Sequence, residues 1–191
     1  MAKRVFFSFH YQDVIDFRAN VVRNHWMTKP NRESAGFFDA SIWETAKKTS
    51  DLALKRLINK GLTNTSKTCV LIGEDTFSRR WVRYEIFRSV FNGNDIIGVH
   101  INKIKCKKGY TKLYGPNPFE YLALQFSEDG WYAQPKEYRT TWKNSRDYER
   151  YKLKTRVSES LRGKSKKLSF WYSTYKWNKD NGYENFSKWI G

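Results

Sequence analysis

The chain has 191 residues, of which 39% are hydrophobic and 17% aromatic. Disordered chains lack such an aromatic content, so we expect a folded protein with a sizeable core. The formal net charge is +17, which favours anionic partners: nucleic acid, phosphorylated small molecules or an acidic protein surface. Residues 1–100 carry 16 Lys/Arg against 10 Asp/Glu (net +6) and residues 101–191 carry 20 against 9 (net +11), so the second half is the more basic.

Two cysteines, Cys69 and Cys106, belong to no metal-spaced pattern. They predict free thiols in a reducing compartment, and we expect no metal site. The N-terminal residues lack the apolar stretch of a signal peptide, and no segment approaches the roughly 20 apolar residues of a membrane helix. The sequence therefore predicts a cytoplasmic protein with no membrane partner.

The first hundred residues alternate between strand and helix patterns. Apolar and aromatic runs predict strands over residues 5–9, 37–39, 68–72 and 96–101. Helical spacing of apolar residues predicts helices over residues 14–25, 51–60 and 80–91, the first capped by Asp13 and the second stopped by Gly61. Residues 29–36 are interpreted as a loop and 40–50 as irregular. This alternation predicts an α/β fold, a largely parallel sheet with helices on both faces, in which strands 4–9, 68–72 and 96–101 are neighbours.

The second half is less regular. Residues 121–126 are a candidate fifth strand, and residues 127–165 show no clear period. We expect helices over residues 168–177 and 185–190, with the aromatic cluster between Phe170 and Trp177 forming a core patch.

Ligands of open α/β sheets bind beyond the carboxyl ends of the strands. This rule selects three loops, at residues 9–13, 39–48 and 73–81. Glu85 lies on the helix after the third loop, one turn from Trp81, so the two side chains share a helix face. By spacing alone, such a Glu is most often part of a solvated helix face.

Two segments resemble TIR domains. Residues 5–13, VFFSFHYQD, are similar to the opening TIR strand and its polar loop, and residues 77–85, FSRRWVRYE, to the TIR segment S-x-x-W-C-x-x-E, with Val82 at the usual Cys position. The segments FDASIWE, GPNPF, SLRGK and DNGY further resemble the TIR-like sensor family of the Thoeris antiphage system. That resemblance covers nearly the whole chain, although residues 127–155 match poorly.

The resemblance implies one flavodoxin-like TIR-like domain over residues 1–191, with a core of about residues 1–126 and a C-terminal elaboration over about 127–191. It implies an enzyme that cleaves NAD, taken as substrate with no further cofactor, and Glu85 as its catalytic residue. The remaining candidates for the NAD site lie at strand ends, carry aromatic rings or, for Arg80, are basic and adjacent to Trp81. They are Ser8, Phe9, His10, Asp39, Trp43, Arg80 and Trp81. Arg79 and Arg83 flank Trp81 and are further candidates for the pyrophosphate.

The chemistry agrees with this assignment. Cleavage of the nicotinamide–ribose bond passes through an oxocarbenium-like state, which a carboxylate beside the ribose can stabilise. Nicotinamide leaves a pyridinium as a neutral molecule, so no acid is needed. The family role further implies a phage protein trigger, a diffusible ADP-ribose-type nucleotide signal and a downstream effector that receives it. The oligomeric state, with a homo-oligomer among the alternatives, stays open.

Two other functions stay open. TIR domains also assemble as non-catalytic interaction modules, which would be expected to lack the Glu. The charge of +17 would suit a nucleic-acid-binding protein, but no nucleic-acid motif supports that interpretation, and we rank it last.

Overall fold

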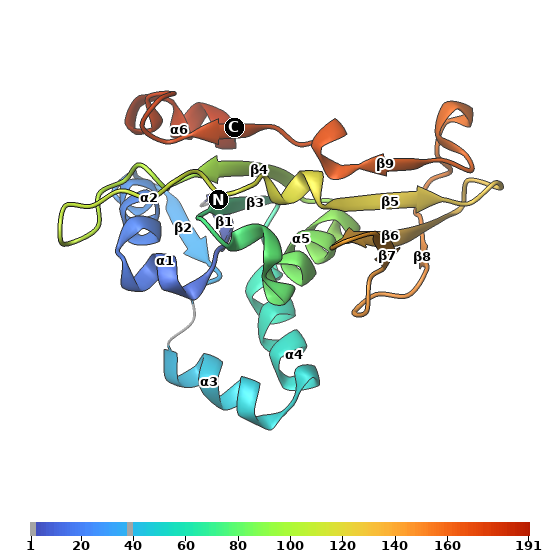
Figure 1. Ribbon diagram of the computed structural model, residues 1–191, viewed down its shortest axis with the longest axis horizontal. Coiled ribbons are helices and arrows are strands. Elements are labelled where there is room, and N and C mark those ends of the chain that lie inside the picture. The colour runs from blue at the N-terminus through green and yellow to red at the C-terminus, as the bar shows by residue number, and fades with distance from the viewer. Residues whose placement is uncertain (1–2, 38–39) are drawn as a thin grey trace.

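The computed structural model describes residues 3–37 and 40–191, with side chains for residues 4–37 and 44–191. Its first sheet consists of five parallel strands in the order β10-β4-β3-β1-β2 (Figure 1). Their bounds are Lys3–Ser8 for β1, Arg32–Ala35 for β2, Lys67–Ile72 for β3, Asp95–His100 for β4 and Thr174–Lys176 for β10. The predicted parallel sheet is confirmed, with β1, β3 and β4 as neighbours.

Both faces of this sheet are buried, which explains why its central strands are almost continuously apolar. On one face, Phe7 and Leu71 pack with α2 (Arg18–Met27) and α6 (Gly182–Ile190). On the other, Phe6 packs against α4 (Asp51–Leu62), and Val70 and Ile72 pack against α5 (Arg80–Asn92). Alternate residues of one strand thus supply two separate cores.

A second, antiparallel sheet lies beyond α5, to the right in Figure 1. Its order is β7-β6-β5-β9, and β8 also pairs with β6. The bounds are Leu122–Phe126 for β5, Tyr132–Tyr138 for β6, Trp142–Asn144 for β7, Tyr151–Lys152 for β8 and Ser165–Lys167 for β9. Leu122 and Phe126 share a core with Ile86 and Phe87 of α5, so this helix is packed between the two sheets.

The remaining helical elements in the described residues are α1 (Tyr11–Ile15), α3 (Ala40–Thr49) and four turns of 3₁₀ helix, Thr76–Ser78, Pro118–Glu120, Glu159–Leu161 and Leu168–Phe170. In the part of the chain that the structure describes, no helix combines the length and apolar character needed to cross a bilayer.

Several local predictions were wrong in the first half. The second strand is Arg32–Ala35, inside the expected loop, while Phe37 is not in a strand and residues 38–39 lie outside those described. Residues expected to be irregular form α3. The helix expected over 14–25 is two helices, because Phe17 adopts a left-handed conformation (φ 67°) between α1 and α2.

Caps and C-terminal elements also differ. Asp13 is buried inside α1, whose N-cap is His10, and α4 continues through Gly61 to Leu62. The predicted helix over 168–177 is instead the 3₁₀ turn Leu168–Phe170 followed by β10. Of the aromatic cluster, Trp177 is buried but Phe170 and Trp171 are exposed, so it is only in part a core patch. The helix expected at 185–190 is confirmed as α6, and β5 forms in the second sheet.

Candidate active site

The carboxyl group of Glu85 lies beneath the carboxyl end of β1. Glu85 is on the second turn of α5 and is only 5% exposed. Ser8, the last residue of β1, is fully buried and donates its hydroxyl hydrogen bond to Oε2 of Glu85, with an Oγ–Oε2 distance of 2.5 Å. The contact joins residues 77 positions apart in the chain, so it exists only once α5 has packed on the sheet.

Burial raises the pKa of Glu85 to about 8, and the hydrogen bond from Ser8 lowers it in part. The cause is desolvation, which disfavours the charged carboxylate. In the free protein at neutral pH this group is therefore mostly protonated. A cation placed beside it would favour the charged form, so the site is suited to a positively charged ligand group.

A cleft of about 340 Å³ opens above Glu85. Its lining comes from the segment after β1 and the start of α1, from α3 and from the start of α5: Phe9, His10, Tyr11, Glu44, Lys47, Arg79, Arg80, Trp81, Val82 and Glu85. The volume is at the lower end of the roughly 300–1,000 Å³ typical of small-molecule sites. One end of a dinucleotide would fit here better than the entire molecule.

Of the predicted site residues, Phe9, His10, Arg80, Trp81 and Glu85 line this cleft, and Ser8 lies directly beneath it through its bond to Glu85. Asp39 and the side chain of Trp43 lie outside the described residues. His10 has a lowered pKa, first because it is partly buried and second because Arg79 is positive, so its imidazole is neutral at pH 7.

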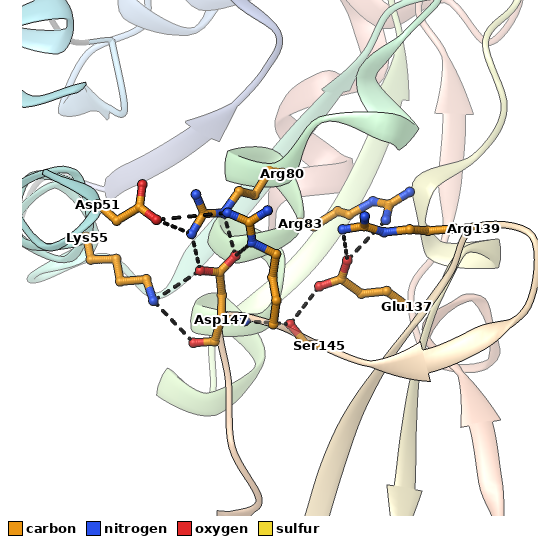
Figure 2. Close-up of polar contacts among 9 residues, drawn as sticks. Asp51, Lys55, Arg80, Arg83, Glu137, Arg139, Ser145 and Asp147 are labelled. Atoms are coloured by element: carbon orange, nitrogen blue, oxygen red, sulfur yellow. Dashed lines mark hydrogen bonds and ion pairs between the residues drawn. The ribbon is translucent and has the colours of Figure 1, made fainter. Parts of the chain in front are cut away.

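The three arginines around Trp81 have different environments. The guanidinium carbon of Arg80 lies over the Trp81 ring, 4.4 Å from its centroid. Its Nε and Nη2 donate hydrogen bonds of 2.8 Å and 2.7 Å to Asp147 (Figure 2). Its Nη2 also contacts Asp51 at 2.5 Å. Arg80 is thus already committed to carboxylates, which weakens its prediction as a phosphate ligand.

Arg83 does not line the cleft; its buried guanidinium bonds Glu137 at 3.1 Å on the other side of α5. Arg79 lines the cleft, and its buried Nε has no hydrogen-bond partner among the residues that the structure describes. Its Nη2 pairs with Asp75 at 3.1 Å at the exposed surface. Arg79 is therefore the arginine best placed to bind an anion in the cleft.

Sequence reasoning missed Tyr11, Glu44, Lys47 and Val82 as lining residues. Tyr11 fell within a loop that the strand-end rule selected, but nothing in the sequence singled it out. Glu44 and Lys47 also fell within a selected loop, residues 39–48, but that segment was expected to be irregular, so the helix that carries them was not foreseen. Within the described part of the chain, no three His, Cys, Asp or Glu side chains gather as a metal site would require.

A five-stranded parallel sheet covered on both faces, with a cleft at the carboxyl ends of its strands, defines an α/β protein of the TIR-like, flavodoxin-like class. Residues 6–105 match the family model "Thoeris protein ThsB, TIR-like domain". A protein of Bacillus cereus (strain MSX-D12), named "Putative cyclic ADP-D-ribose synthase ThsB1", is 61% identical over 193 aligned residues, covering 100% of both chains. The chain belongs to this ThsB family of Thoeris antiphage proteins.

Proposed function

We propose that this protein cleaves NAD at the nicotinamide–ribose bond and converts the ADP-ribose part into a cyclic ADP-ribose-type signal, with Glu85 as the catalytic residue. The observation that carries the proposal is a buried carboxyl group at the floor of a strand-end cleft, held by Ser8. Family membership and the name of the Bacillus relative support the same reaction.

The nicotinamide end of NAD would enter the cleft as a pyridinium cation. Its charge favours ionised Glu85, and the carboxylate then stabilises the positive ribose ring as the C–N bond breaks. The bond electrons leave with nicotinamide, which becomes neutral. In cyclisation, a nucleophilic atom of the adenosine part attacks the ribose carbon, forms the new bond and loses a proton. In hydrolysis, water attacks instead and gives linear ADP-ribose. NAD is consumed as a substrate in this scheme, and no further cofactor takes part.

The start of α5 is the part of the cleft suited to the pyrophosphate. Its first turn contains no acidic residue of its own and its N-cap side chain makes no capping hydrogen bond, so no group of the helix itself neutralises its positive end. Arg79, at the N-cap, adds a guanidinium whose buried Nε finds no hydrogen-bond partner in the described part of the chain. Trp81, half-buried in the same wall, offers a ring on which nicotinamide can stack.

In the cell we infer that the protein works in the cytoplasm, where a phage protein triggers it and a downstream effector receives the diffusible signal. We further propose that it acts as a homo-oligomer. These steps rest on family membership and not on contacts within this chain.

The decisive experiment is mass spectrometry of lysates from phage-infected cells that carry the intact system with wild-type protein or Glu85→Gln. The wild type should accumulate a cyclic ADP-ribose-type product that the variant does not make. Glu184→Gln, an exposed change on α6, is the matched control and should behave as wild type. Equal product from Glu85→Gln would refute the catalytic assignment.

A further inference from the structure

A second cavity, of about 450 Å³, lies on the other side of Arg80 from the cleft. It opens between the start of α5 and the β6–β7 hairpin of the second sheet. Its lining residues are four arginines, three aromatic residues and one serine: Phe77, Ser78, Arg80, Arg83, Tyr121, Tyr138, Arg139 and Arg146. No carboxylate is among these described lining residues, so the cavity presents only positive charge.

Two of the arginines are held by ion pairs with buried carboxylates of the second-sheet region. Arg83 bonds Oε2 of Glu137, whose Oε1 accepts a 2.6 Å bond from Ser145 (Figure 2). Arg80 is held by Asp147, which also pairs with Lys55 at 3.1 Å. The side chains of Glu137 and Asp147 are only 7% and 3% exposed, so these ion pairs are rigid parts of the wall.

The other two arginines remain available. Arg139 and Arg146 are each 54% exposed; Arg139 approaches Glu137 at 3.7 Å, and Arg146 approaches Asp147 and Asp51 at 3.9 Å. Glu137 and Asp147 already accept shorter hydrogen bonds from other donors. Among the described residues, the side chains of Arg139 and Arg146 have no hydrogen bond. Both guanidinium groups can therefore turn toward a bound anion without breaking an existing short contact.

Three of the lining residues are aromatic. Phe77 and Tyr121 have ring centroids 4.9 Å apart, and Tyr121 and Tyr138 are 5.9 Å apart, so the three rings form one continuous surface. All three are half-buried, and the two tyrosine hydroxyls have no hydrogen-bond partner among the described residues. Such a wall suits a flat ring that stacks and also carries polar edges.

From this juxtaposition we propose that the cavity is a binding site for a nucleoside phosphate, separate from the cleft that holds Glu85. The phosphates bind Arg139 and Arg146, with Arg80 and Arg83 as a fixed positive wall, and the base stacks on Phe77, Tyr121 or Tyr138. Guanidinium pairs match phosphate oxygens in geometry as well as charge. The proposal stands independently of NAD cleavage.

The test is calorimetric titration of the full-length protein with ADP at roughly 50 mM salt, where electrostatic contacts are weakly screened. Wild type should bind ADP, and Arg139→Gln/Arg146→Gln should weaken that binding by about tenfold or more. Lys105→Gln/Lys108→Gln removes the same charge from exposed positions outside both cavities and should change affinity by less than about twofold. Because Arg139 and Arg146 do not line the cleft, ADP bound only in the cleft would be insensitive to their loss, and that result would overturn the proposal.

Further titrations identify the part of the ligand that is recognised. ADP should bind more tightly than inorganic pyrophosphate or adenosine, and Tyr138→Leu should remove the advantage of ADP over pyrophosphate. Equal affinity for ADP and pyrophosphate would show that the cavity binds anions without recognising the nucleoside, and would overturn the proposal of a nucleoside phosphate site. A random-sequence single-stranded oligonucleotide that binds about tenfold more tightly than ADP, through the same two arginines, would replace the proposal with nucleic-acid binding.

Discussion

Ser8 Oγ lies 2.5 Å from Glu85 Oε2, and this hydrogen bond fixes the carboxyl group of α5 against the last residue of β1. Both partners are buried, so the geometry of the pair is set by packing of the helix on the sheet. The contact gives the carboxyl group a defined position and partly offsets the cost of its ionisation.

The stability of the Glu85→Gln variant relative to wild type should increase as the pH rises. Burial raises the pKa of Glu85 from 4.5 to about 8, so between these values the folded state keeps a proton that the unfolded state loses. Wild-type stability therefore falls with increasing pH across this window, whereas the variant lacks this loss. The gain at pH 8.5 relative to pH 4.5 should be on the order of a few kcal/mol. Chemical denaturation of both proteins across this range measures it, and a difference that does not vary with pH would contradict the burial argument.

Ser8→Ala should raise the pKa of Glu85 further. The Ser8 hydroxyl favours the charged carboxylate, and a hydrogen bond to a charged group contributes roughly 1.5–3 kcal/mol, or about 1–2 pH units. Titration of ¹³C-labelled glutamate carboxyl groups by NMR gives the value directly, without need of activity. An unchanged Glu85 titration would mean that the hydroxyl does not interact with the ionised form.

Arg79→Gln should mainly affect NAD binding, whereas Arg80→Gln should mainly affect stability. Within the described residues, the ion pair of Arg79 is the exposed one with Asp75, so loss of Arg79 should change the free energy of unfolding by less than about 1 kcal/mol while raising the KM for NAD. Arg80→Gln removes the guanidinium that pairs with the buried carboxylate of Asp147 and leaves Lys55 as the close cation of Asp147. This change should lower the free energy of unfolding by about 3 kcal/mol. Thermal unfolding together with NAD kinetics separates the two effects. Equal destabilisation by both variants would contradict these different environments.

Glu137→Gln should destabilise the protein by about 3 kcal/mol, because it leaves the buried Arg83 guanidinium without its carboxylate. Glu120→Gln is the matched control, since Glu120 also pairs with a cation in the second-sheet region, Lys167, but at the exposed surface. The control should lose less than about 1 kcal/mol in urea denaturation. A similar loss for the two variants would show that burial of the Glu137 pair is not what matters.

The sequence predicted the central strands well because their signal is local. Residues 68–72 and 96–101 are apolar on both faces, as a buried parallel strand requires, and they form β3 and β4. The second strand, with the sequence RESA, has no apolar run, because it is an edge strand whose pairing partner in the described sheet is β1 alone. Its position depends on a neighbour distant in the chain, which a local pattern cannot show.

The part of the candidate site that follows local sequence patterns was predictable too. Ser8, Phe9 and His10 follow a clear strand, and Trp81 and Glu85 share a helix face, so strand-end geometry and family resemblance together selected them. The pairing of arginines was not predictable. Arg80 and Arg83 find Asp147 and Glu137 more than 50 residues later in the chain, in a region without a clear periodic pattern.

The strand β10 places a constraint on how the protein is made. It pairs with β4, and α6 follows it and packs against Phe7 of β1 through Phe186. During synthesis, β4 therefore leaves the ribosome long before the strand that covers its edge. A nascent or prematurely terminated chain would expose that edge and the apolar surface beneath α6, which favours aggregation or proteolysis. Quality control in the cell would thus remove incomplete copies of this protein.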